Sequence, residues 1–335
     1  MTRATNSKTR RQALTALALT ALALLPALAA GAARSALAQD SRIFQIIVGY
    51  PPGGGSDVLA RVLSEPLAKL LGRPVVVKNV PGASGQIAAM TLLRDGDDGL
   101  SILAINHPDL FMAVERSSGS LKAADFQVVV VDVQDPRVFL VKADSPIDSF
   151  ATFVARATAQ PGHLTVSVTA GSAQELFAKW LFDRLGLDVI VVGYKGGAEA
   201  ANALISNVVV GSIGDDFARL NLRSLSKALF VGAQERSPRW PEAPTLAAAL
   251  APFGITPPTA NFLSRYGVYV VPSALKTKDS AAYLRMQQTL LQARASPEFQ
   301  GYIAKSQLQD LSIGKPGEDF ESAFAADMVE IRSIK

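Results

Sequence analysis

The chain has 335 residues, no cysteine and a formal net charge of +4. Residues 1–38 carry five basic residues and no acidic one, so the remaining chain, with 28 basic and 29 acidic residues, has a net charge of −1. No run of basic residues beyond residue 38 exceeds two, which argues against nucleic-acid binding. Nearly 300 residues can bury an ample core without disulfides.

Residues 1–38 have the pattern of a secretory signal peptide. Basic residues come first, residues 13–30 are almost all alanine and leucine, and an Ala-Leu-Ala cleavage site ends at Ala38. The alternative is a retained membrane anchor, but the apolar run is barely long enough to span a bilayer. The Arg-Arg pair at residues 10–11 resembles part of a twin-arginine signal. We expect export to the periplasm, by the Sec or the Tat route, with cleavage before Gln39.

The first element beyond this segment is a strand, a glycine-rich loop and a helix. Residues 46–48 predict a buried strand, residues 51–55 break the chain, and Ser56 or Asp57 can cap the following helix. Backbone N–H groups and the helix dipole then favour an anion at one point. The loop is neither a P-loop nor a Rossmann fingerprint, and a purely structural turn is the alternative. The candidate ligand-binding residues here are Tyr50, Gly53, Gly54, Gly55, Ser56 and Asp57.

The next segment repeats this arrangement. A strand at residues 75–77 enters a small-residue loop and a helix at residues 87–93, and a third strand covers residues 100–105. Pro66 should kink the preceding helix. Parallel strands joined by helices place their loops at one sheet edge, where α/β proteins bind ligands. The added candidates for ligand binding are Ala83, Ser84, Gly85 and Asn106.

The pattern of alternating strands and helices then starts again and predicts a second α/β domain. Two strands are expected first, with a turn at residues 134–136 between them. Other expected strands cover residues 164–168, 188–192, 208–213 and 266–271, and expected helices cover residues 147–159, 173–185, 198–205, 280–295, 297–306 and 316–334. Residues 237–258 are rich in proline and read as an irregular connection. Ser172 and Glu175 form a capping box, for which a purely structural role is the stronger reading.

Together these motifs resemble the receptors of tripartite tricarboxylate transporters, the Bug family of periplasmic solute-binding proteins. The resemblance covers roughly residues 43–334. It rests on the order and spacing of motifs at residues 51–61, 72–79, 81–85, 98–99, 194–196, 236–238 and 241–245.

The resemblance implies a type II-like periplasmic binding protein with two α/β domains, crossing hinge strands and a ligand cleft between the domains. The expected division is residues 39–135 and 265–335 for the first domain and 136–264 for the second. The implied ligand is a small carboxylate or related polar metabolite, held by backbone amides and hydroxyls. The implied partner is a two-component membrane permease, and we expect a monomer.

The second-domain loop departs from the family pattern. A Ser/Thr-rich stretch ending in Thr-His is usual, whereas here Gln174 and Glu175 follow the candidate ligand-binding residues Thr169 and Ser172. Glu175 would repel a second ligand carboxylate unless it pairs elsewhere, and this repulsion would favour a monocarboxylate or a ligand with a hydrogen-bond donor. Asp215 or its neighbour Asp216 can accept from such a donor. Arg265 is a possible carboxylate partner, but we expect it to be solvated.

An enzyme is the main rival class. The chain has only His107 and His163, so few bases are available to a nucleophile, and two histidines without cysteine cannot form the usual zinc sites. We therefore expect no catalytic residue, no metal and no cofactor. A receptor that signals to a membrane histidine kinase is a further alternative, and the sequence does not separate it from a transport receptor.

Overall fold

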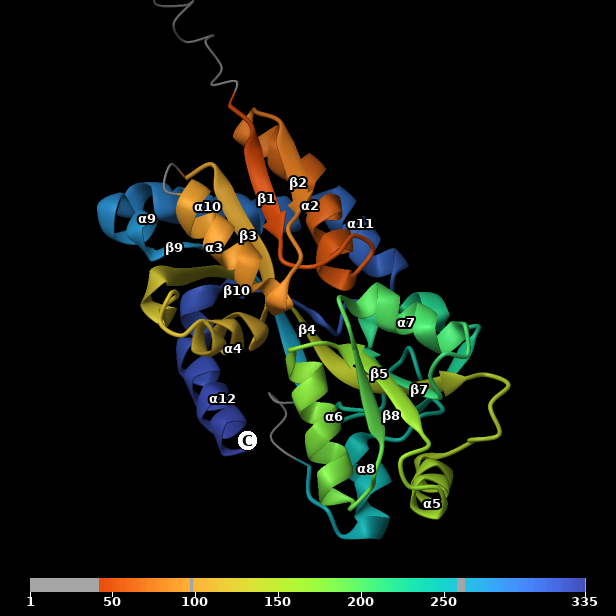
Figure 1. Ribbon diagram of the computed structural model, residues 1–335. Helices are drawn as coiled ribbons and strands as arrows, with labels where there is room; N and C mark the ends of the chain where they lie inside the picture. The colour runs from red at the N-terminus through yellow and green to blue at the C-terminus, as the bar shows by residue number, and fades with distance from the viewer. Residues whose placement is uncertain (1–41, 97–98, 258–262, 335) are drawn as a thin grey trace, which may run out of the picture.

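A computed structural model describes residues 42–96, 99–257 and 263–334 (Figure 1). The expected signal peptide lies outside these residues. The chain forms two α/β lobes, and the long strand β4 (Phe126–Lys142) contributes to both. Among the described residues, no helix combines the length and apolar character needed to cross a bilayer.

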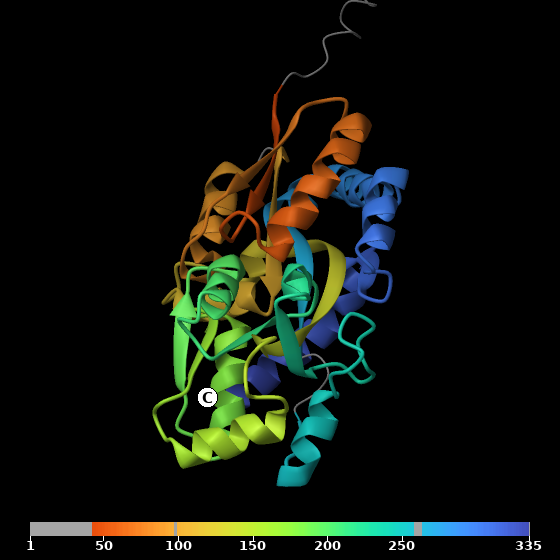
Figure 2. The same cartoon turned by 90° about the vertical axis from the view of Figure 1, so that its right-hand side faces the viewer.

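The first domain is a mixed sheet in the order β2-β1-β3-β9-β4, with β10 on the other side of β4. Strands β1, β2 and β3 are parallel, whereas β9 runs antiparallel to β3 and β4. Helices α2, α10 and α11 lie side by side, as Figure 2 shows. The strands are β1 (Phe44–Val48), β2 (Val75–Asn79), β3 (Ser101–His107), β9 (Ser264–Pro272) and β10 (Ser312–Pro316). The helices are α2 (Gly55–Leu71), α3 (Gln86–Asp95), α4 (Asp109–Arg116), α9 (Ser273–Lys278), α10 (Ser280–Arg294), α11 (Pro297–Lys305) and α12 (Glu321–Ser333).

The second domain continues from the far half of β4. Its strands β7, β5 and β6 are parallel to one another and follow β4 in that order, with β7 antiparallel to β4. Strand β8 pairs with the opposite side of β4. Phe139 of β4 packs against Phe153 and Phe230, with ring centroids 4.9 and 5.6 Å apart. The strands are β5 (Thr165–Thr169), β6 (Ile190–Tyr194), β7 (Gly211–Asp215) and β8 (Ser226–Val231), and the α-helices are α5 (Phe150–Ala159), α6 (Ala173–Arg184), α7 (Gly197–Ile205) and α8 (Leu246–Leu250).

Short 3-10 segments complete the secondary structure. They are η1 (Ala83–Gly85), η2 (Ala123–Asp125), η3 (Phe217–Leu222), η4 (Ala251–Phe253) and η5 (Gly317–Phe320). The segment η3 follows β7 directly and lies at the cleft described below.

The turn expected at residues 134–136 is wrong, because β4 is one continuous strand. Asp135 and Pro136 pair with Arg265 and Ser264 of β9, and Arg137 pairs with Asp215 of β7. A proline is tolerated where the ladder is interrupted, and β4 changes its partner at this point. The Asp-Pro turn signal is therefore overridden by pairing with distant segments.

Two expectations for helices also need correction. Helix α2 continues through Pro66 to Leu71. The last helix begins at Glu321 rather than at residue 316, because residues 312–316 form β10. Met328 and Ile331 of α12 are buried in the core of the second domain, so this helix packs against both domains.

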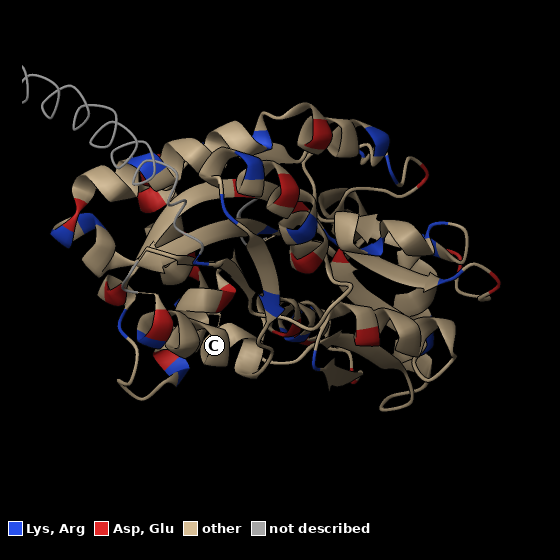
Figure 3. Cartoon of the chain, turned by 90° about the horizontal axis from the view of Figure 1, so that it is seen from above, with Lys and Arg blue, Asp and Glu red and all other residues tan. Residues whose placement is uncertain are grey.

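Charged side chains are distributed over both lobes. In the view of Figure 3, basic and acidic residues are scattered over the chain, and neither sign gathers on one side. A cluster of buried charges, which pairs Arg137 with Asp215 and Arg265 with Asp135, lies where β4 passes between the domains.

Candidate functional site

The glycine loop before α2 is held by one carboxylate. Asp57 accepts hydrogen bonds from Gly53 N (2.9 Å), from Asn79 Nδ2 (2.8 Å) and from the guanidinium of Arg61. Burial raises the pKa of Asp57, but these hydrogen bonds outweigh it and leave the pKa below its ordinary value. Gly53 has φ +85°, a conformation that favours glycine. Asp57 therefore shapes the loop.

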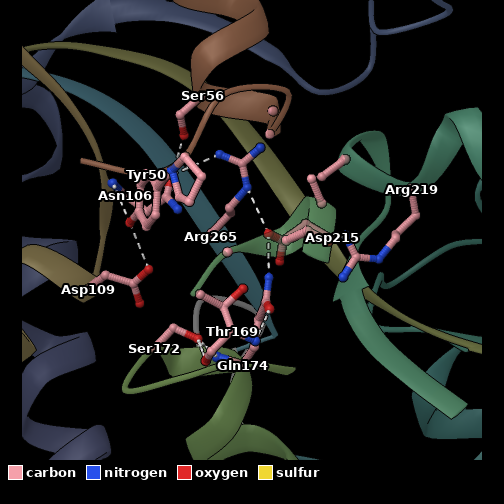
Figure 4. Close-up of a pocket in the computed structure, with 17 residues that line it drawn as sticks. Tyr50, Ser56, Asn106, Asp109, Thr169, Ser172, Gln174, Asp215, Arg219 and Arg265 are labelled. Carbon is pink, nitrogen blue, oxygen red and sulfur yellow. Dashed lines mark hydrogen bonds and ion pairs between the residues drawn. The ribbon is translucent and has the colours of Figure 1, made fainter. Parts of the chain in front are cut away.

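The loops at the carboxyl ends of the parallel strands in both domains meet at one cleft (Figure 4). Its cavity of about 40 Å³ has room for only a few waters, so the two domains are closed on each other. The first domain lines the cleft with Tyr50, Pro51, Gly54, Gly55, Ser56, Asn106, Asp109 and Arg265, and the second with Thr169, Ser172, Gln174, Gly196, Gly197, Ala198, Asp215, Ala218 and Arg219.

A chain of hydrogen bonds crosses the cleft. Ser56 Oγ donates to Asn106 Oδ1 over 3.1 Å, and Arg265 Nη1 donates to the same oxygen over 2.9 Å. Arg265 Nε lies 3.0 Å from Asp215 Oδ2, which also accepts from Gln174 Nε2 over 2.8 Å. The first turn of α2 is thus linked to the first turn of α6 through the side chains of Asn106, Arg265 and Asp215.

Arg265 and Asp215 also connect this chain of contacts to a buried ionic cluster. Arg265 also binds Asp135 over 2.8 Å, and Arg137 pairs with Asp215. Burial raises the pKa of Asp135 to about 7, with Arg265 opposing the shift and Asp215 and Asp216 adding to it. Arg265 is 2% exposed, so the expectation that it is solvated is wrong.

A second contact joins the domains through Asp109. Its carboxylate accepts from Tyr50 Oη over 2.9 Å and from the backbone N–H of Ala173, the first residue of α6, over 2.8 Å. Burial and the neighbouring Asp109 raise the pKa of Tyr50 well above its ordinary value. Ser84 Oγ adds a hydrogen bond to the carbonyl of Ala170 over 2.5 Å.

The structure brings nine of the predicted site residues to the cleft. They are Tyr50, Gly54, Gly55, Ser56, Asn106, Thr169, Ser172, Gln174 and Asp215. The predicted residues that do not line it are Gly53, Asp57, Ala83, Ser84, Gly85 and Glu175. Glu175 accepts from Gly171 N over 2.6 Å and from Lys179 Nζ over 2.6 Å, and so fixes its own loop.

Sequence reasoning did not identify Asp109 and Arg219 as residues of the cleft. Asp109 starts α4, a helix that the sequence pattern did not reveal, and Arg219 lies in the short segment η3. Neither residue belongs to a recognisable motif. The one sequence signal that could have identified them is their position, since each follows the carboxyl end of a strand.

His107 lies away from the cleft lining and holds α12 in place. Its Nε2 is 2.9 Å from Asp327 Oδ2, and its ring stacks on Phe324 with centroids 3.9 Å apart. Burial lowers the pKa of His107, partly offset by Asp327. Within the described ranges, no three His, Cys, Asp or Glu side chains are grouped as a metal site would require.

Two α/β domains closed over a polar cleft, with the strand β4 shared between them, define a periplasmic binding protein fold. The chain belongs to the tripartite tricarboxylate transporter family receptors, whose family model matches residues 59–308. This is a family of non-enzymatic solute-binding receptors.

Individual relatives agree with this assignment. The chain is 30% identical over 290 residues to Protein BugT of Bordetella pertussis, covering 81% of this chain and 87% of the relative. It resembles the solved structure of periplasmic binding protein BugD, with a TM-score of 0.76, 21% identity and coverage of 88% and 96%. It also resembles a protein of R. palustris solved with adipate, with a TM-score of 0.75, 22% identity and the same coverage.

Proposed function

We propose that this receptor is exported to the periplasm, captures a small carboxylate in the cleft between its domains, and delivers it to a two-component membrane permease. The observation that carries the proposal is the start of α2 at the cleft. The first N–H groups of a helix have no partner within the helix, and Gly54, Gly55 and Ser56 line the cavity at this point.

The closed cleft supports capture rather than surface binding. A ligand larger than a few waters requires the domains to separate, and closure then surrounds it with polar groups from both walls. The relative solved with adipate shows that the family fold accommodates a carboxylate in at least one protein. Export of this chain is proposed from the signal pattern of residues 1–38 and from the family's periplasmic setting.

A thermal-shift screen tests the ligand class. The purified chain without residues 1–38 is heated with monocarboxylates, dicarboxylates, amino acids, nicotinate-like acids and neutral sugars. A ligand at 100 times its dissociation constant should stabilise the protein by about 2.7 kcal/mol. We expect stabilisation by acids, and a preference for neutral sugars over every acid would contradict the proposal.

A further inference from the structure

Arg219 is a buried arginine, and only one of its guanidinium nitrogens donates a hydrogen bond to a described residue. It is 1% exposed and lines the cleft from the segment η3 of the second domain (Figure 4). Its Nη1 donates to the carbonyl of Gly197 over 2.8 Å. Among the residues that the structure describes, its Nε and Nη2 have no hydrogen-bond partner. These two atoms form one edge of the guanidinium, so a complete pair of donors is unpartnered.

Two glycines make the space in which this guanidinium lies. A Cβ on Gly214 would lie 2.5 Å from Arg219 Nε, 2.6 Å from Cζ and 2.8 Å from Nη2. A Cβ on Gly197 would lie 3.2 Å from Nη1. Neither glycine has a positive φ, so the backbone does not require glycine at these positions. The small residues instead leave room for Arg219 beside the cleft.

The other ionic groups of the cleft are already paired. Arg265 is bound by Asn106, Asp135 and Asp215, and Asp215 also binds Arg137 and Gln174. Arg219, in contrast, has no ion pair within 4.0 Å in the described part of the chain. A buried charge without a close counterion is costly, which makes an anion from outside the chain a favourable partner.

The charge of Arg219 persists in the buried site. Burial lowers its pKa, while the more distant carboxylates of Asp215 and Asp135 raise it. The ordinary value lies so far above neutral that the guanidinium stays protonated in the periplasmic pH range.

We propose that Arg219 binds a carboxylate of the ligand side-on, through its Nε–Nη2 edge. This inference rests on the proposed function. Two parallel N–H donors match the two oxygens of a carboxylate in a bidentate pair. Residues 54–56 supply a separate set of donors from the opposite domain. A ligand with two carboxylates satisfies both sets, so the geometry favours a dicarboxylate.

This assignment reverses the preference inferred from the sequence. That preference rested on repulsion between Glu175 and a second ligand carboxylate. Glu175 is tied to Gly171 and Lys179 and does not line the cleft, so the repulsion has no structural basis. The second domain instead brings Arg219 to the cleft, and its Nε and Nη2 are buried without a hydrogen-bond partner among the described residues.

The test is isothermal titration with succinate, malate and adipate and with the half-amide of each acid. The proteins are the wild type, Arg219→Gln and Arg219→Lys, with Arg223→Gln as the matched control. Arg223 is close to Arg219 in the chain but pairs with Glu242 outside the cleft. We expect at least one diacid to bind the wild type more tightly than its half-amide. Arg219→Gln should lower the affinity for that diacid about 10- to 100-fold and reduce the preference for the diacid over its half-amide.

Two further readouts separate binding from folding. Arg219→Lys keeps the charge but loses the bidentate edge, so it should not restore wild-type affinity, whereas Arg223→Gln should bind like the wild type. Gly214→Ala should displace the Nε–Nη2 edge of Arg219 without removing the arginine, and so it should also lower the affinity for the diacid. The melting temperature of ligand-free Arg219→Gln should not fall, because the substitution removes a buried unpaired charge.

The outcomes distinguish this inference from the proposed function. If Arg219→Gln binds the diacids as tightly as the wild type does, the inference is overturned, but the proposed function as a carboxylate receptor stands. The same holds if the wild type binds only monocarboxylates. Wild-type affinity in Gly214→Ala would overturn the side-on geometry. If no acid binds the wild-type protein, the proposed function fails as well.

Discussion

Asp109 of the first domain accepts a hydrogen bond from the backbone N–H of Ala173 in the second, over 2.8 Å. Asp109 begins α4 and Ala173 begins α6, so a side chain of one domain caps a helix of the other. A carboxylate at a helix N-terminus is stabilised by the unpaired N–H groups and by the helix dipole. The chain therefore supplies an acceptor of its own to the start of α6, and this contact bridges the two domains.

Replacing Asp109 by alanine should open the ligand-free protein. The substitution removes the acceptor for Ala173 N–H and for Tyr50 Oη, at a cost of about 1–3 kcal/mol to the closed form. Small-angle scattering should show a larger radius of gyration than for the wild type. Asp109→Asn is the matched control, because it keeps an acceptor oxygen at the same length. Identical scattering from Asp109→Ala and the wild type would show that this contact does not hold the domains.

Asp57→Asn should destabilise the first domain, and the loss of stability should be larger at neutral pH than at acidic pH. The charged carboxylate holds Gly53, Asn79 and Arg61, so its loss should lower the free energy of unfolding by about 1.5–3 kcal/mol. Because the folded pKa is below the unfolded value, this stabilisation is present above the unfolded pKa and is lost as the pH falls through the folded pKa.

Urea titrations between pH 3 and pH 7 measure this effect. The difference between the wild type and Asp57→Asn should shrink as the pH falls. Glu65→Gln, which removes an exposed pair with Lys69, is the control and should cost less than about 1 kcal/mol at any pH. A difference that is constant with pH would contradict the role of the Asp57 charge.

His107 should make the protein less stable in mildly acidic solution. Its folded pKa is lowered by burial, so between this value and the ordinary pKa of about 6.5 the unfolded chain binds a proton that the folded chain does not. Stability should therefore fall as the pH drops below about 6.5 towards the folded pKa. Melting curves of His107→Gln should lack this decline, and those of His163→Gln, which changes an exposed turn, should retain it.

Glu175→Thr should change stability but not ligand preference. Glu175 binds Gly171 N and Lys179 away from the cleft lining, so we expect a loss of about 1–2 kcal/mol and an unchanged order of ligand affinities. Gln174→Ala is the comparison, because Gln174 lines the cleft and contacts Asp215. It should alter affinities in the same titrations. A dicarboxylate preference that is stronger in Glu175→Thr than in the wild type would restore the repulsion inferred from the sequence.

The glycine loop and the alternating strands could be predicted because they depend on local sequence. A β-branched run, a set of breakers and a capping residue specify strand, loop and helix within one segment, and this placed residues 54–56 at the cleft. Arg265 could not be predicted as buried, because its environment comes from Asp135 and Asp215, 130 and 50 positions away in the chain. The continuous strand β4 was missed for the same reason, since its pairing partners at residues 264–266 are distant.

The two ends of residues 137–263, the segment that forms the second lobe, are neighbours. Pro136 pairs with Ser264, and Arg137 N donates to the carbonyl of Leu263 over 2.8 Å. The segment between these points could therefore be exchanged between members of the family at a single pair of adjacent junctions, with the first domain left unchanged. Because Met328 and Ile331 of α12 are buried in the second lobe, a functional chimaera must bring the matching end of α12 with it. An exchange at these two junctions and at α12 would replace one side of the cleft, including Arg219, and keep the other side as it is.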